Sequence, residues 1–316
     1  MNENNDNDSI TKDSRLAARP PVARQSHDVD RQHADAHRAA GGCHNLIREI
    51  SRISHELEPS VPSDWMVKRS LFFAYELVSR IKGAESERDR LAMLNCFVFE
   101  EKRFECIADP TRLKEPREAY CFSSVLTKRM GAPTVLALIY AFLADRIGVK
   151  LEFVDLKPTC FLKWTDQNGR SRFIDISRAG ATLSSDELIE TLHSRFQMTT
   201  LAHSSLLETL SFEAYLTEYL GALRQTLMML NEPAKLLFIQ NTLIAYQPSN
   251  LLFLAERAVL YRRLGNFKSA LSDLKRFFAF YEREKAPQDL VKLYDELNAW
   301  FENFNRQIEP QTEPLH

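Results

Sequence analysis

Glycine is scarce in this chain of 316 residues, and several other signatures of familiar protein classes are missing. The nine glycines argue against a glycine-rich phosphate-binding loop and against a β fold with many tight turns. The five cysteines are odd in number and show neither CxxC pairs nor the spacing of zinc ligands. We therefore expect reduced thiols in a cytoplasmic protein, without a metal or another cofactor.

Strong charge and long apolar runs are also absent. The formal net charge is −2, which gives no electrostatic basis for binding nucleic acid or an anionic membrane. The longest apolar run, from Ala132 to Ala144, is shorter than the ~20 residues that a membrane-spanning helix needs. The first residues, MNENNDNDS, lack the basic and apolar segments of a secretory signal. The expectation is a cytoplasmic protein with no membrane partner.

The sequence divides into segments of different character. Residues 1–42 carry almost no large apolar side chains, and we expect a disordered tail there. Residues 43–205 predict a mostly helical α+β domain. Residues 206–306 predict helical repeats with a capping helix, and residues 307–316 a frayed end.

The α+β segment is organised around a helix, predicted from Pro133 to Ile147, that is apolar nearly all round. Apolar periodicity predicts further helices over 44–57, 64–81 and 85–101, and a short helix over 119–130 that ends at Gly131. Residues 102–118 are expected to form a long loop. In the second helix we assign the apolar side chains to the core, and these include Met66, Leu71, Phe72, Tyr75, Leu77 and Val78.

Three short strands are expected after the central helix. Alternation and an Asn-Gly turn predict strands over 150–156, 160–164 and 172–177, paired as an antiparallel meander against that helix. The sequence from Ser184 to Glu187 is typical of a helix start.

The C-terminal segment contains an internal repeat. When the sequence is shifted so that Asn231 falls on Gly265, Leu220 falls on Leu254. The second copy, AERAVLYRRLGNFKSALSDLKRFF, has the pattern of a tetratricopeptide repeat, a helix–turn–helix unit with a period of about 34 residues. The first copy is degenerate, and a last helix, LVKLYDELNAWFENF, is expected to cap the array.

These motifs in their order carry a resemblance to a known family. LNCFVFEEKRF, SSVLTKRMGAPTVLALIYAFLADRIGV, PTCFLKW and FIDIS, followed by the repeats, resemble the bacterial SirB-type proteins. Those proteins have a transglutaminase-like domain followed by tetratricopeptide repeats. The resemblance implies a transglutaminase-like, papain-like fold of helices and a small antiparallel sheet.

The same resemblance implies a catalytic triad that this sequence does not keep. The family fold places a nucleophilic Cys at the start of the central helix, a His on the following strand and an Asp on the next. The matching positions here are Pro133, Cys160 and Asp175. Only the carboxylate remains, and we expect it to cap a turn or to pair with Arg172 or Arg178. A thiol cannot replace histidine as a base near neutral pH.

Two hypotheses about function follow. We favour a non-catalytic protein-interaction or regulatory protein, built on a degenerate transglutaminase-like domain and repeats that bind a protein or peptide. The alternative is a thiol-dependent acyl transferase or hydrolase that uses Cys160 or Cys121 with His193 or His203 as base. Whether the protein is an enzyme stays open, although the missing triad groups favour the first hypothesis.

Arg262 and Arg263 are the candidate binding residues in the repeats. They lie on the helix expected to line the repeat groove, and guanidinium groups bind carboxylates with two hydrogen bonds. An acidic peptide is the ligand that this pair predicts.

Overall fold

The computed structural model describes residues 42–156, 159–196 and 208–308. Almost all of the expected tail at 1–42, the expected boundary between residues 205 and 206, and most of the expected frayed end at 307–316 lie outside these ranges. Within them the chain is mostly helical with a small sheet, so the predicted α+β class is confirmed.

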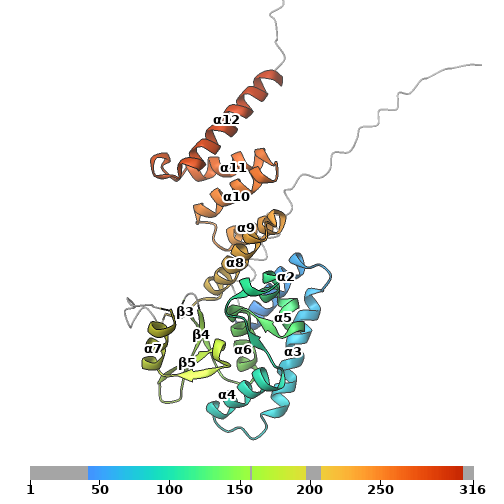
Figure 1. The fold of residues 1–316 in the computed structure, drawn as a ribbon, viewed down its shortest axis with the longest axis vertical. Coiled ribbons are helices and arrows are strands. Elements are labelled where there is room, and N and C mark those ends of the chain that lie inside the picture. The colour runs from blue at the N-terminus through green and yellow to red at the C-terminus, as the bar shows by residue number, and fades with distance from the viewer. Residues whose placement is uncertain (1–41, 157–158, 197–207, 309–316) are drawn as a thin grey trace, which may run out of the picture.

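The first domain begins with helices and ends with the sheet (Figure 1). Its elements are α2 (Cys43–Leu57), α3 (Ser63–Arg80), α4 (Glu87–Asn95) with a π-helical extension (Cys96–Glu101), β1 (Glu105–Cys106), two 3₁₀ turns (Pro110–Arg112 and Pro116–Ala119), α5 (Phe122–Lys128), β2 (Met130–Gly131), α6 (Pro133–Arg146), β3 (Glu152–Leu156), β4 (Thr159–Thr165), β5 (Ser171–Asp175), a 3₁₀ turn (Ile176–Arg178), β6 (Ala181–Leu183) and α7 (Ser185–Phe196).

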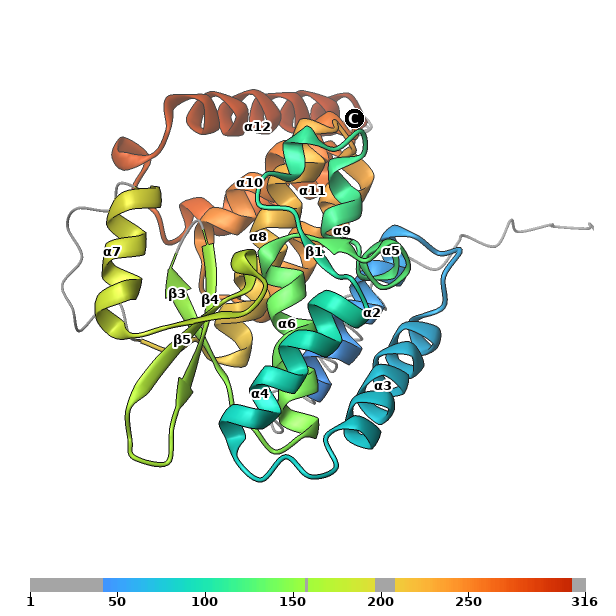
Figure 2. The same cartoon turned by 60° about the horizontal axis from the view of Figure 1, so that its bottom comes forward.

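The predicted central helix is α6. Every residue from Val135 to Ala144 is buried, because helices α2, α3 and α4 pack against it together with strand β4 (Figure 2). Pro133 occupies the first helical position, where its missing N–H leaves no hydrogen bond unmade. The helix therefore forms the centre of the first domain.

The meander has one strand more than predicted. Strands β3, β4, β5 and β6 pair in that order, all antiparallel. Strand β6 has only three residues, too few for an alternating pattern to be recognised. Gly180 makes the turn before it with a φ of +76°, and a Cβ there would lie 2.0 Å from the side-chain oxygen of Asn95.

Two details of the helical half differ from expectation. The stretch expected as loop contains β1, which pairs in parallel with β2 so that Cys106 lies opposite Gly131. Helix α5 ends at Lys128 and not at Gly131, and the residue that caps it, Arg129, is in the left-handed conformation with a φ of +63°.

Helix α3 is apolar on both faces, and only one of them is buried. The core side is formed by Met66, Phe73 and Leu77. The side chains that we had assigned to the core but that are exposed are Leu71, Phe72, Tyr75 and Val78.

The C-terminal region consists of paired helices. They are α8 (Phe212–Met229), α9 (Pro233–Tyr246), α10 (Leu251–Arg263), α11 (Phe267–Phe278) and α12 (Gln288–Ile308). The turns after α8 and α10 each contain a residue with positive φ, Asn231 and Gly265, which are the two residues that the internal repeat aligns. In Figure 1, α10, α11 and α12 continue the stack away from the first domain.

The first helix pair belongs to the same core as the α+β domain. Buried side chains of α8 and α9, among them Leu216, Leu220, Ile239 and Leu243, join the main hydrophobic cluster that contains α6. Helices α11 and α12 pack in separate, smaller clusters. Within the ranges described, every helix is too short or too polar to cross a bilayer.

Candidate functional site

The start of α6 is the place where the resemblance puts a nucleophile. Ala132 precedes the helix and Pro133 opens it, with no side-chain cap. The carbonyl of Thr134 accepts a hydrogen bond from the hydroxyl of Tyr215, which comes from α8. A buried tyrosine therefore occupies this end of α6, and no thiol extends from its first turn.

Cys160 lies on β4 and points into the core. Its side chain is 6% exposed, and it stands opposite Asp155 of β3 in the strand register. Burial and the neighbouring Cys106 raise the pKa of the thiol to about 12. At neutral pH this thiol is protonated and shielded from solvent, which are poor conditions for a nucleophile.

Asp175 ends β5, and its buried carboxylate is fully occupied. It accepts hydrogen bonds from the backbone N–H of Ser177 at 2.9 Å and from the hydroxyl of Ser177 at 2.5 Å. Its other oxygen binds Arg195 of α7 at 2.9 Å. The turn cap that we expected is present, but the ionic partner is Arg195 and neither Arg172 nor Arg178. The carboxylate holds the turn after β5 and docks α7, so it is not free to orient a base.

Cys106 is a neighbour of this cluster that the sequence analysis did not select. It lies on β1 and borders a cavity of about 370 Å³, whose other walls include Phe104, Ile176 and Ser177. Burial first, and then the charge of Asp175, raise the pKa of this half-buried thiol to about 12, although Arg195 opposes the shift. Cys106 is therefore more accessible than Cys160, although its thiol is no more acidic.

The remaining thiol and histidine candidates do not come together. Cys121 is fully buried, and burial followed by the charge of Glu58 raises its pKa to about 12. His193 is exposed on α7, and His203 lies outside the described residues. Among the residues that the structure describes, neither Cys160 nor Cys121 has a histidine as hydrogen-bond partner.

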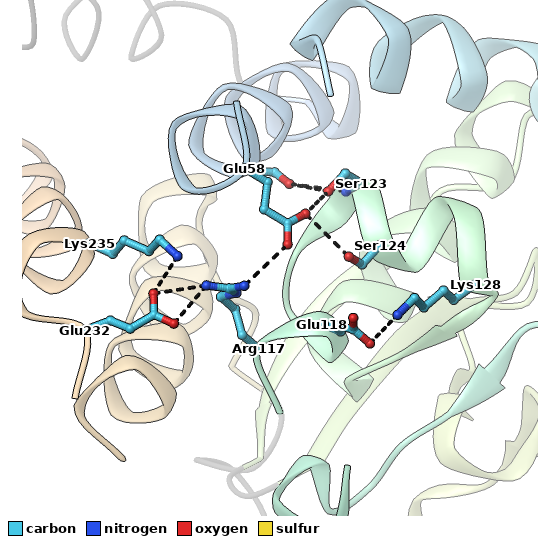
Figure 3. Close-up of polar contacts among 9 residues, drawn as sticks. Glu58, Arg117, Glu118, Ser123, Ser124, Lys128, Glu232 and Lys235 are labelled. Carbon is cyan, nitrogen blue, oxygen red and sulfur yellow. Dashed lines mark hydrogen bonds and ion pairs between the residues drawn. The ribbon is translucent and has the colours of Figure 1, made fainter. Parts of the chain in front are cut away.

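A polar network joins the first domain to α9 (Figure 3). Arg117 donates to both carboxylate oxygens of Glu232, at 2.8 and 3.0 Å, and Lys235 lies 2.6 Å from the same carboxylate. Glu58, 3.9 Å from Arg117, accepts a hydrogen bond from Ser123 at 2.7 Å. Charged groups from the residue after α2, the turn before α5 and α9 thus compensate one another, so this junction is structural.

In the helical region the sequence analysis missed a buried ion pair. Arg257 of α10 and Asp273 of α11 are both buried, and two 2.7 Å hydrogen bonds join them. The pair ties these two helices together. The sequence alone does not predict this pair, because most arginines in folded proteins are exposed to solvent.

The two predicted binding arginines lie in the last turn of α10 and are exposed. Arg262 is 3.5 Å from Glu296 of α12, with both side chains more than half exposed. Arg263 donates to the side-chain oxygen of Asn231, a neutral partner, at 2.5 Å. The ion pair of Arg262 is exposed to solvent, and the partner of Arg263 carries no charge.

Comparison with protein families identifies the first domain. Residues 44–220 match the model of the transglutaminase-like superfamily, which is more than half of the chain. The protein therefore belongs to the transglutaminase-like superfamily. The match includes the first part of α8, in agreement with the core that this helix shares with α6. Comparison with curated proteins and with solved structures found no match. The described residues contain no group of three or more His, Cys, Asp or Glu side chains placed to hold a metal ion.

Proposed function

We propose that this protein is a non-catalytic interaction protein of the bacterial SirB type, in which a transglutaminase-like domain without its triad supports a short tetratricopeptide-like array in the cytoplasm. The proposal rests on the side chains found at the three triad positions. Pro133 offers no nucleophile, Cys160 is buried with a raised pKa, and Asp175 is bound to Ser177 and Arg195.

The thiol-dependent alternative lacks the arrangement that such chemistry needs. A cysteine nucleophile needs a lowered pKa or an adjacent base, and solvent access for its substrate. Cys160 and Cys121 have the opposite properties, since burial raises the pKa of both thiols. The interaction hypothesis requires none of these properties.

Catalysis is tested directly with the folded protein. Incorporation of a fluorescent amine into casein and hydrolysis of an activated ester are measured from pH 6 to 9, for the wild type and for Cys106→Ala. We expect both proteins to give the rate of the buffer blank. A wild-type rate at least tenfold above the blank that disappears in Cys106→Ala would refute the non-catalytic hypothesis, because that thiol borders the cavity.

The array supports a binding role through its spacing and its exposed positive charge. The turns at Asn231 and Gly265 both have positive φ, and their separation in the sequence equals the period of about 34 residues that is typical of tetratricopeptide units. Arg262 and Arg263 stay available to a carboxylate ligand, since the one is 3.5 Å from an exposed partner and the other binds a neutral amide.

Binding at these arginines is tested with a fluorescein-labelled acidic hexapeptide that keeps its free C-terminus. The double variant R262E/R263E should weaken its binding at least tenfold in anisotropy titrations. The matched control is K275E/R276E, which reverses the same number of charges at exposed positions on α11. Equal binding to the two double variants would exclude the arginine pair as the binding residues.

A further inference from the structure

Helix α3 exposes a row of large apolar side chains that no other described element covers. Trp65, Phe72 and Tyr75 are 41%, 50% and 75% exposed, and Leu71 and Val78 beside them are 38% and 44% exposed. Figures 1 and 2 both show α3 along the outer edge of the domain. Five such side chains on one helix form a contiguous patch, and patches of this kind mark interaction surfaces.

The spacing of the row is that of a helix–helix seam. Trp65, Lys68, Phe72, Tyr75 and Ser79 follow one another at intervals of three and four residues along α3. Leu71 and Val78 lie seven residues apart on one flank. Intervals of three and four place side chains along one narrow stripe, which packs against the grooves of a second helix.

Positive charge borders this stripe. Arg69 lies over the ring of Phe72, 5.6 Å from its centroid. The buried Nε of Arg69 finds no hydrogen-bond partner in the described part of the chain. Lys68 extends from the stripe itself.

Two of the other charges of α3 are already paired, and Asp64 in its first turn adds one negative charge. Glu76 binds Lys102 at 2.8 Å, and Arg80 binds Glu101 at 2.8 Å. The charge left to a partner is therefore mainly cationic. This disfavours a second copy of α3, which would bring like charges together.

A bilayer is also a poor match for this surface. A helix that lies in a membrane surface buries its apolar face there, whereas Lys68 and Ser79 interrupt the exposed apolar stripe of α3. An amphipathic helix with acidic flanks matches both the width of the stripe and its charge.

We propose that the exposed stripe of α3 binds an amphipathic helix of a partner protein, whose apolar seam packs on Trp65, Phe72 and Tyr75 and whose carboxylates pair with Lys68 and Arg69. The proposal rests on the proposed interaction function. It names a surface separate from Arg262 and Arg263, and the chemical class of the partner.

The probe is a pair of fluorescein-labelled synthetic helices of three heptads with identical leucine seams, one flanked by glutamate and one by lysine. Anisotropy titrations should show binding of the glutamate peptide at least tenfold tighter than that of the lysine peptide, and weaker binding in 0.5 M NaCl. The double variant Phe72→Ser/Tyr75→Ala should lose at least tenfold in affinity. Replacing exposed side chains leaves the core intact, which circular dichroism verifies.

Two matched controls separate this inference from the proposed function. Phe280→Ser removes a side chain that is 80% exposed elsewhere and should leave binding unchanged, as should R262E/R263E. Loss of binding in R262E/R263E with retention in Phe72→Ser/Tyr75→Ala would overturn the α3 site and leave the interaction function standing. Equal affinity for the two peptides would overturn it as well.

The other possible occupants are tested with the same proteins. Sedimentation equilibrium at 100 µM should show a monomer, and flotation with vesicles of one part phosphatidylserine to two parts phosphatidylcholine should leave the protein unbound. A dimer or vesicle binding that Phe72→Ser/Tyr75→Ala abolishes would overturn the inference in favour of a second copy or a lipid surface.

Discussion

The buried thiols give the sharpest prediction, because their protonation and their reactivity are linked. At pH 7.5 a free cysteine with a pKa of ~8.5 is roughly one-tenth thiolate. A thiol with a pKa of about 12, such as Cys160, has a thiolate fraction roughly 3,000-fold smaller. The higher basicity of its thiolate restores roughly 40-fold in nucleophilicity, at a Brønsted slope of ~0.45. The net expectation is labelling roughly 70-fold slower than for free cysteine, before any steric protection.

The assay is limited alkylation with 1 mM iodoacetamide at pH 7.5, followed by peptide mass spectrometry at successive times. Cys96 is exposed and serves as the internal reference in the same chain. We expect Cys96 to label first, and Cys106, Cys121 and Cys160 to label only after denaturant is added. Labelling of any of these three faster than free glutathione would mean a lowered pKa, and would refute both the reasoning from burial and the non-catalytic hypothesis.

Three further predictions concern stability. Gly180→Ala should lower the free energy of unfolding by roughly 2–4 kcal/mol, because it adds left-handed strain and a Cβ 2.0 Å from an amide oxygen. The control is Gly169→Ala, at a similar φ but in open space. In the same urea titration it should lower the free energy of unfolding by only ~1 kcal/mol. Asp273→Ala should lower the free energy of unfolding by roughly 3–5 kcal/mol, because it leaves a buried guanidinium unpaired. Arg262→Ala, at an exposed pair, should lower it by less than ~1 kcal/mol. Equal decreases for the two variants would show that burial does not determine the stability of an ion pair in this protein. The free energy of unfolding should also fall as pH rises above ~8.5, because the folded state keeps protons on thiols that the unfolded chain releases. Urea titrations at different pH values measure this effect. A flat profile from pH 8 to 10 would contradict the raised pKa values of the partly or fully buried thiols, Cys43, Cys106, Cys121 and Cys160.

The parts of the fold that depend on local patterns were predictable. An apolar run bounded by Pro133 and Gly148 specifies a buried helix, and α6 has those limits to within two residues. The internal repeat aligns Asn231 with Gly265, and both residues have positive φ. In each case the residues that decide the structure are neighbours in the sequence.

The parts that depend on distant contacts were not predictable in this way. Cys106 reaches the triad positions through a two-residue parallel pairing with β2, and a segment of that length has no periodicity. Asp175 pairs with Arg195, twenty residues further along the chain, although two other arginines are closer in sequence. Each contact depends on how elements dock and not on the pattern within one element.

The exposed face of α3 shows a different reason for failure. Periodicity identifies which residues of a helix share a face, but Met66 and Phe73 form one apolar face and Phe72 and Tyr75 another. Where both faces are apolar, the sequence cannot say which of them meets the core. The sequence of such a helix predicts a contact for each apolar face. Among the described residues only the core contact is present.

The position of α8 connects the missing triad to the helical region. Tyr215 donates to the carbonyl of Thr134 in the first turn of α6, and Tyr219 donates to the carbonyl of Tyr120 at 3.0 Å. Both tyrosines are fully buried, and the ring centroid of Phe153 from the sheet lies 3.8 Å from that of Tyr215. The first helix of the C-terminal region thus packs directly against the end of α6 where a transglutaminase-like nucleophile would stand. Moving α8 away from this end would leave the two buried hydroxyls without partners, which costs roughly 1–3 kcal/mol for each group. In the proposed function this end of α6 is instead a docking point, through which the central helix holds the helical region in place.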